Sequence, residues 1–205
     1  MFKVYSRREL ERKSRLLASM HLTRTSQFVD RHNWSVRLND QGLEVDEFDD
    51  MHSYYAISSF RDVHLASVRI RPMSLGSLLE KSFSHLMHDL PSNPAEIEIT
   101  RLCVNGQLAP HLRAEGMTEM LLGLCRHFQK THVQNFVGIV FPSIARVARA
   151  TGWPPEVISK GEYDGKTVWL CRWQPGPDVE AAMKRIAALR KARTATPQIS
   201  QPIAA

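Results

Sequence analysis

Residues 95–104, AEIEITRLCV, and residues 111–131, HLRAEGMTEMLLGLCRHFQKT, decide the fold. The first stretch is rich in β-branched and apolar residues and stops at the turn pair Asn105-Gly106, which predicts a strand. The second predicts a long helix, because apolar residues recur at intervals of four, three and four, namely at Met117, Leu121, Leu124 and Phe128. A strand that leads directly into a long helix is typical of an α/β protein.

Weaker patterns on either side of this pair complete the element order. Helices are predicted over 7–32, 78–88, 143–151 and 178–192, and strands over 35–38, 53–59, 64–71, 136–141, 156–160 and 166–173. This order predicts an α/β fold, a mixed sheet between helices in an α-β-α sandwich, and it is shared by N-acetyltransferase (GNAT) folds.

The length of 205 residues suits one sizeable core. We expect a single domain over 1–175, a C-terminal helix over 176–193 and a disordered tail over 194–205, where the sequence is polar and contains Pro.

The composition indicates what kind of partner the protein binds and in which compartment it works. The net charge of +6 indicates an acidic partner, either nucleic acid or an acidic protein, although no nucleic-acid motif accompanies it. The three cysteines are far apart and form no CxxC pair, which fits a reducing compartment. With no apolar run long enough for a membrane span or a secretory signal, we expect a cytoplasmic protein.

Several chemistries lack their motifs. The chain has no GxGxxG, P-loop, HExxH or GxSxG pattern. His85 and His88 could share one metal ion on a helix, but no third ligand has a natural place beside them, so we expect surface histidines and no metal site.

A series of residues in the first half of the chain carries more information. In order, they are Arg24, Phe28, Trp34, the acidic run Glu44-Val45-Asp46-Glu47-Phe48-Asp49, Arg69, Arg71-Pro72, Phe83 and Glu98-Ile99-Thr100-Arg101. This series, over residues 24–101, resembles the acyl-homoserine-lactone synthase family in order and spacing. Departures at Met73, Ile97 and Val140-Phe141 leave the acyl specificity open.

The resemblance implies a two-step acyltransferase reaction. The amine of S-adenosylmethionine attacks an acyl thioester, and the methionyl carboxylate then closes the lactone and releases methylthioadenosine. The product is an N-acyl-L-homoserine lactone, a quorum-sensing signal. S-adenosylmethionine is therefore expected as a substrate, and no cofactor is expected.

Glu98 is the candidate catalytic base. A free α-amino group titrates near roughly 7.7 to 8.0, so the attacking amine must lose a proton at neutral pH. Glu98 lies on an otherwise apolar strand and can take this proton directly or through water. The alternative is an exposed strand carboxylate without a chemical role. Resemblance to the acetyltransferase fold also implies a β-bulge that turns Arg101 toward the cleft, where it can hold a carboxylate of the substrate or of the acidic loop.

The other candidates are divided between substrate binding and structure. Asp46, Asp49 and Arg69 need partners if they are buried, and we expect an ion-pair network that ties the N-terminal helices to the sheet. Substrate contacts are expected from Arg24, Phe28, Trp34, Phe83, Arg101, Val140 and Phe141. Phe28 and Trp34 would offer aromatic faces to the sulfonium, and packing in the core is the alternative, more so for Phe28 than for Trp34. Phe83 fits the acyl tunnel and the core equally well.

Two other functions compete with the synthase. A coenzyme A-dependent N-acyltransferase of the GNAT type would need a glycine-rich phosphate turn between the central strand and the long helix, but residues 105–110 hold one glycine and no basic residue. A basic nucleic-acid-binding module is the second alternative. The absent cradle and the positive charge favour an acyl carrier protein as donor, with Arg146 and Arg149 as its docking residues and no nucleic-acid partner.

Overall fold

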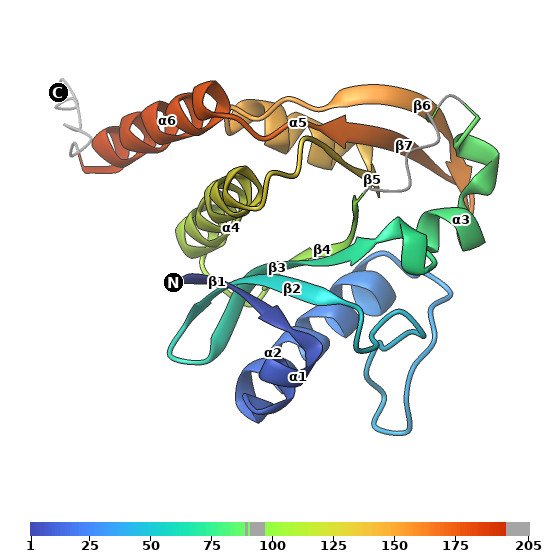
Figure 1. Cartoon of the computed structure of the whole chain (residues 1–205). Coiled ribbons are helices and arrows are strands. Elements are labelled where there is room, and N and C mark those ends of the chain that lie inside the picture. Colours follow the sequence, from blue (N-terminus) through green and yellow to red (C-terminus); the bar gives the residue numbers. More distant parts are fainter. Residues whose placement is uncertain (89, 91–96, 196–205) are drawn as a thin grey trace, which may run out of the picture.

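The computed structural model describes residues 1–88, 90 and 97–195 (Figure 1). One seven-stranded mixed sheet runs through it in the order β1-β2-β3-β4-β5-β7-β6. Helices cover both faces, so the predicted α-β-α sandwich is confirmed. None of the described helices combines the length and the hydropathy that crossing a bilayer requires.

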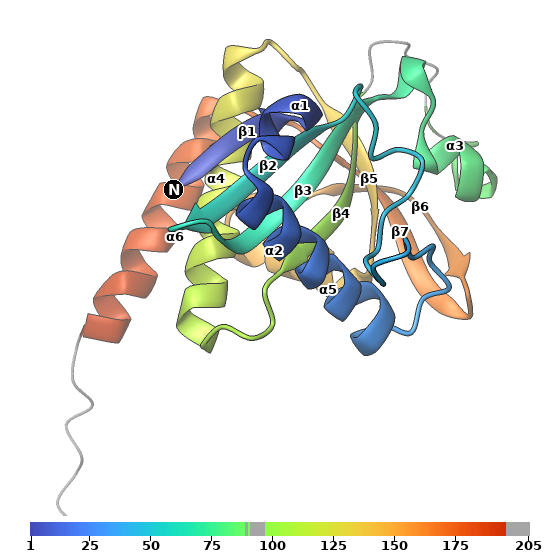
Figure 2. The same ribbon diagram turned by 90° about the horizontal axis from the view of Figure 1, so that it is seen from below.

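The N-terminal half of the sheet is antiparallel. Its strands are β1 (Phe2–Ser6), β2 (Tyr54–Phe60), β3 (Val63–Pro72) and β4 (Ile97–Val104). Helices α1 (Arg7–Glu11) and α2 (Ser14–Thr25) lie on one face, and Figure 2 shows α2 crossing it. The long helix α4 (Pro110–Lys130) packs on the opposite face of β1, β2 and β3.

The C-terminal half is added through a parallel pair. Strand β5 (Phe136–Val140) lies beside β4, and the antiparallel strands β7 (Lys166–Trp173) and β6 (Glu156–Tyr163) follow. Helix α5 (Pro142–Ala150) contacts β5 and β7, and α6 (Pro177–Ala195) packs along α4. Helix α3 (Leu78–Ser82) stands at the other end of the sheet (Figure 1).

The alternation in β3 divides the interior into two chemically different layers. Ala66, Val68 and Ile70 are buried in the main hydrophobic core beneath α4. Arg69 and Arg71, on the opposite face of β3, are equally buried but point toward the α2 layer. One face of the strand therefore contributes to the hydrophobic core, and the other places two buried arginines between the sheet and α2.

The helix predicted over 7–32 is divided into three parts. α1 ends at Glu11, and Lys13 leaves the helical region with φ −112° and ψ 61° before α2 begins. A π-helix then covers Ser26–Arg31. Ser6 and Glu9 form a capping box that starts α1. The break changes the direction of the chain, so that α2 lies across the sheet. Helix propensity alone does not predict this break.

Further differences from the prediction concern short segments and helix ends. Residues 35–38 form no strand, only an isolated bridge between Leu38 and Glu44. The helix predicted over 78–88 ends at Ser82, because Phe83 turns to φ −133°, and a 3₁₀ turn follows at Ser84–Leu86. Strand β1 was not predicted. Helix α6 reaches Ala195, and the tail from 196 lies outside the described residues.

The central strand β4 contains a bulge. Ser67 pairs with Cys103 and Arg69 with Thr100, so two residues of β4, Arg101 and Leu102, stand opposite one of β3. Arg101 has a φ of +56°, a left-handed conformation that is uncommon for a residue with a side chain. The bulge breaks the alternation and brings Arg101 to the side where the cavity described below lies.

Strands β4 and β5 pair only at their beginnings. The registered pairs are Ile97 with Phe136 and Glu98 with Val137, and beyond them the strands separate. Gly138 sits where the strands are still close, since a Cβ there would lie 2.7 Å from the carbonyl oxygen of Ile99. This glycine therefore sets how near the strands approach before they part.

Gly138→Ala is expected to lower the free energy of unfolding by about 1–3 kcal/mol, because the added methyl meets a backbone atom that cannot rotate away. Urea denaturation measures the effect. Gly106→Ala is the matched control, since its Cβ would enter open space, and it should stay within about 0.5 kcal/mol of wild type. Equal stability of the two variants would contradict this account of Gly138.

Candidate active site

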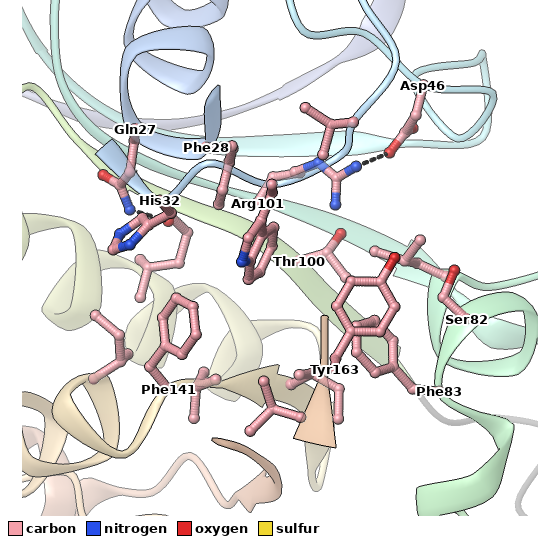
Figure 3. Close-up of a pocket in the computed structure, with 18 of the residues that line it drawn as sticks. Gln27, Phe28, His32, Asp46, Ser82, Phe83, Thr100, Arg101, Phe141 and Tyr163 are labelled. Atoms are coloured by element: carbon pink, nitrogen blue, oxygen red, sulfur yellow. Dashed lines mark hydrogen bonds and ion pairs between the residues drawn. The ribbon is translucent and has the colours of Figure 1, made fainter. Parts of the chain in front are cut away.

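A cavity of about 320 Å³ opens where β4 and β5 separate. Its walls come from the π-helix, the loop after it, the acidic loop, α3 and the two strands, and from residues of α4, α5, β6 and β7. In Figure 3, Phe28 and Arg101 lie on one side of the cavity, and Phe141 and Tyr163 lie on the other. A splayed strand pair thus provides the site, and loops from the N-terminal half close it.

Aromatic side chains form much of the wall. Phe28 and Trp34 stack with ring centroids 5.3 Å apart and an interplanar angle of 18°. The Phe141 and Trp34 ring centroids lie 5.3 Å apart, and those of Phe83 and Tyr163 lie 4.6 Å apart. The buried indole Nε1 of Trp34 has no hydrogen-bond partner among the described residues. These rings can hold a cation over their faces and an apolar chain between their edges.

A second, smaller cavity of about 50 Å³ lies beside the first. Both are lined by Thr100, Met117, Ile139, Val140 and Ile144, together with Arg101 and Leu102. The rest of the smaller cavity is apolar and ends among Leu124, Phe136, Trp153 and Trp173 of the main core. The larger cavity therefore adjoins an apolar extension beneath α4 and α5.

Behind one wall lies a buried ion-pair network. Arg24 donates from its Nε to Glu44 at 2.5 Å and holds Asp49 with two further hydrogen bonds of 2.7 and 2.8 Å. Arg69 binds Asp46 at 2.5 and 3.0 Å and lies 3.3 Å from Asp49. The acidic loop is thereby fixed to both α2 and β3.

Arg101 joins the same network from the bulge. Its Nε donates to Glu44 at 2.9 Å and its Nη2 to Asp46 at 2.6 Å. Arg24, Arg69 and Arg101 are thus matched by the carboxylates of Glu44, Asp46 and Asp49, which satisfies buried charge. The network ties α2 and the acidic loop to β3 and β4, the arrangement expected of Asp46, Asp49 and Arg69.

The Asp46 and Asp49 carboxylates of this network stay ionised. Burial alone would raise the pKa of Asp46, but the guanidinium groups of Arg69 and Arg101 outweigh it and hold this pKa below its usual value. Burial opposes ionisation of Asp49 as well, and Arg24 and Arg69 likewise depress its pKa. Burial and the nearby Asp49 carboxylate raise the pKa of Tyr55, whose hydroxyl donates to Asp49 at 2.8 Å.

Glu98 lies one layer behind the cavity wall. Its side chain is fully buried and accepts hydrogen bonds from the backbone N–H groups of Leu79, at 2.7 Å, and Leu78, at 3.3 Å. Burial raises the pKa of this carboxyl, although the two N–H groups and Arg69 act against it. The exposed alternative is therefore wrong. Leu78 and Leu79 themselves line the cavity, so Glu98 also fixes the start of α3.

The predicted substrate-contact residues fall into two groups. Phe28, Trp34, Phe83, Arg101, Val140 and Phe141 all line the larger cavity. Arg24 does not, because its side chain is 1% exposed and its nitrogens are occupied by Glu44 and Asp49. We therefore reassign Arg24 from substrate contact to the network.

The sequence analysis did not identify several residues of this region. Glu44 bridges Arg24 and Arg101, and Thr100 lines both cavities while its Oγ1 accepts from Arg69 Nε at 3.1 Å. Both stand inside quoted motifs, so alternation and burial could have indicated them. Arg31 and Tyr163 also line the cavity, but no sequence pattern marks them.

The remaining predictions concern the surface. Arg146 and Arg149 are exposed on α5, as are His85 and His88 around the 3₁₀ turn. No group of three or more metal-ligating side chains occurs in the described part of the chain. Cys103, Cys125 and Cys171 are all free and buried.

Sequence comparison identifies the family. The family model described as autoinducer synthase matches residues 8–183. The chain belongs to the autoinducer synthase family. Among curated relatives, the acyl-homoserine-lactone synthase of Pseudomonas amygdali pv. tabaci is 32% identical over 160 residues, which cover 76% of this chain and 70% of the relative. That of Enterobacter agglomerans is 26% identical over 153 residues, or 71% and 69%. The chain is accordingly an enzyme.

Solved structures share the autoinducer synthase fold. BjaI, a CoA-dependent acyl-homoserine lactone synthase solved with SAM and isopentyl-CoA, has a TM-score of 0.79 at 17% identity, with 91% of this chain and 89% of that chain covered. The AHL synthase LasI has a TM-score of 0.76 at 20% identity, with coverage of 89% and 93%. An acyl-CoA N-acyltransferase from Pseudomonas aeruginosa reaches 0.53 at 13%, with coverage of 84% and 97%. The GNAT-like fold expected from the element order is thus confirmed.

Proposed function

We propose that this autoinducer synthase transfers an acyl group from a thioester to the amine of S-adenosylmethionine and then closes the N-acyl-L-homoserine lactone. The observation that carries this proposal is the cavity between β4 and β5, where a stacked aromatic pair, Phe28 and Trp34, faces an apolar extension. The rings suit the sulfonium and the extension suits an acyl chain.

In the first step, the amine nitrogen attacks the thioester carbon and the thiolate leaves. The amine must be neutral to attack, so it has to give up a proton. Glu98 is the proposed acceptor of this proton. Its carboxylate lies behind the wall formed by Leu78 and Leu79, so the proton would reach it through a water molecule. Its burial makes it a stronger base than an exposed glutamate.

In the second step, a carboxylate oxygen attacks the methionyl carbon that carries the sulfonium. The C–O bond closes the lactone while the C–S bond breaks, and neutral methylthioadenosine leaves with the bonding electrons. Well-oriented intramolecular attack can contribute roughly 7–11 kcal/mol. A folded substrate in a rigid aromatic cavity satisfies this need without a further catalytic group.

We further propose an acyl carrier protein as the donor. The turn between β4 and α4 offers few free donors for a pyrophosphate, because the N–H of Gln107 binds Asn105 Oδ1 at 3.1 Å and that of Leu108 binds the Asn105 carbonyl at 3.3 Å. The same chemistry with coenzyme A remains the alternative, and both BjaI and MesI are described as CoA-dependent synthases.

The proposed docking surface is the exposed side of α5. Ser143 and Ile144 line the larger cavity, and Val147 lines the smaller one, so this helix borders the acyl site directly. Arg146 and Arg149 alternate with these positions and face solvent. An acidic carrier bound there would be steered by their charge.

Reversal of both charges, Arg146→Glu with Arg149→Glu, should lower kcat/KM for an acyl carrier protein by roughly an order of magnitude at low salt. The loss should shrink as salt screens the interaction. Arg12→Glu with Arg15→Glu, an exposed pair with the same spacing near the start of α2, is the control. An acyl-coenzyme A donor with the higher kcat/KM, together with no effect of the α5 reversal, would disprove carrier docking.

The product is expected to lack a 3-oxo group. Val140 lines both cavities and offers no side-chain donor, and a buried oxygen without a donor costs about 1–3 kcal/mol. Mass spectrometry of lactones made from saturated and 3-oxo donors of equal length measures the preference. A dominant 3-oxo product would contradict the prediction and would implicate the Thr100 hydroxyl as donor.

The proposed reaction is tested by incubating the purified chain with S-adenosylmethionine and an acyl carrier protein that bears a saturated chain. Chromatography with mass detection should show equal amounts of lactone and methylthioadenosine. Formation of an acylated amine without methylthioadenosine would support a plain N-acyltransferase instead, and no acylated product from either thioester would overturn the proposal.

A further inference from the structure

The cavity wall carries more positive than negative side chains. The wall holds four cationic side chains, Arg31, Arg37, Lys81 and Arg101, and two anionic ones, Asp46 and Glu47. Lys81 pairs with Glu47, and Arg101 pairs with Asp46 at 2.6 Å. Two positive charges are left over, and they belong to Arg31 and Arg37.

Neither of these arginines has a side-chain hydrogen bond or ion pair within the described ranges, and both are exposed to solvent while lining the cavity. The other arginines around the acidic loop differ in this respect. Arg24, Arg69 and Arg71 are buried and already bind Asp49, Asp46 and Asp50, respectively. An anion that enters the cavity therefore finds its free partners at positions 31 and 37.

The place of Arg31 links this charge to the aromatic wall. It ends the π-helix, three residues after Phe28 and three before Trp34, the two rings that stack at 5.3 Å. His32, the next residue, also lines the cavity and approaches Phe141 at 5.1 Å. Burial, together with Arg31 and Lys166, lowers the pKa of His32, so the imidazole is neutral at neutral pH and adds no third charge.

We propose that Arg31 and Arg37 form the binding site for the carboxylate of the amino-acid substrate, S-adenosylmethionine. This inference rests on the function proposed above. In that substrate the carboxylate and the sulfonium are separated by only three carbon atoms. Two cations that line the same cavity as the stacked rings can therefore hold the carboxylate of the same molecule.

The donor phosphate is the competing anion, and its position argues against it. In a carrier-bound or coenzyme A thioester, the whole pantetheine arm separates the phosphate from the reacting carbonyl. A phosphate at Arg31 would thus require the thioester to react far from the aromatic pair. Binding the carboxylate instead leaves two cations near the amine, which favours the neutral, nucleophilic form of that amine.

A chemical double-mutant cycle tests the assignment. Calorimetry compares S-adenosylmethionine with its decarboxylated analogue, which keeps the sulfonium and the amine. Wild type should bind the carboxylated compound at least about tenfold more tightly, as expected for a charge-assisted hydrogen bond. The double variant Arg31→Gln with Arg37→Gln should bind both compounds equally, and Arg15→Gln, an exposed arginine on α2, should keep the preference.

Steady-state kinetics provides the second readout. The double variant should raise the KM for S-adenosylmethionine and leave the KM for the acyl donor unchanged, with an unaltered melting temperature because both side chains are exposed. If the variant retains the wild-type preference between the two compounds, the carboxylate site is wrong while the proposed reaction stands. A raised KM for the donor alone would assign the arginines to phosphate. Failure of wild type to bind either compound would remove both proposals.

Discussion

Glu98→Gln is expected to lower kcat by about 100- to 10,000-fold, the range that a general base contributes. The two side chains are nearly isosteric, and glutamine retains an oxygen that can accept from the Leu79 N–H. The variant should therefore fold and bind S-adenosylmethionine. What it loses is the ability to take a proton from the attacking amine.

The pH dependence of kcat provides an independent check on this role. Burial raises the pKa of Glu98, so the acid limb of the wild-type profile should lie above the pH at which an exposed glutamate titrates. The limb should vanish in Glu98→Gln. The raised pKa also makes the free energy of unfolding depend on pH. A carboxyl whose pKa is higher in the folded than in the unfolded state stabilises the fold while it is protonated, and this contribution is lost as pH rises through the folded-state pKa. The variant should consequently lose less stability than wild type over that interval.

Glu162→Gln, at an exposed position of β6, is the matched control and should leave both kcat and the profile unchanged. A Glu98→Gln enzyme with wild-type kcat would exclude Glu98 as the base. A raised KM for the acyl donor at unchanged kcat would instead assign Glu98 to holding the start of α3, whose residues Leu78 and Leu79 line the cavity.

Arg69→Ala is expected to lower the free energy of unfolding by about 3–5 kcal/mol, because it leaves Asp46 and Asp49 buried beside fewer cations. The Thr100 hydroxyl loses its partner as well. Chemical denaturation at neutral pH measures the loss. Activity should fall in parallel, since Thr100 and Asp46 line the cavity.

Arg61→Ala, in the exposed β2–β3 turn, is the control and should change stability by less than about 0.5 kcal/mol. Acid should reproduce part of the Arg69 effect in the wild type. The depressed pKa values of Asp46 and Asp49 give stability that is complete above their unfolded-state values and is lost as pH falls below them toward the folded-state values. If Arg69→Ala unfolds at the wild-type denaturant concentration, the network carries no net stability.

The sequence by itself determined the layer order, the central strand and the long helix. These elements can be predicted because buried and exposed positions alternate with a short period along a helix or strand, so the pattern is visible within a few residues. The motif series likewise pointed to the family and to the residues that gather around β4. It also indicated that Asp46, Asp49 and Arg69 would need one another, because unpaired buried charge is costly.

Only the tertiary structure decided how these residues divide between network and cavity. Arg24 and Arg101 belong to equally recognisable motifs, yet the bulge at Arg101 turns one toward the cavity while α2 holds the other behind Glu44 and Asp49. The absence of a carboxylate partner for Arg31 among the described residues was likewise visible only in the tertiary structure. Whether a charged side chain is free to bind a substrate depends on which distant carboxylates reach it, and contacts between residues far apart in the chain leave no local pattern to read.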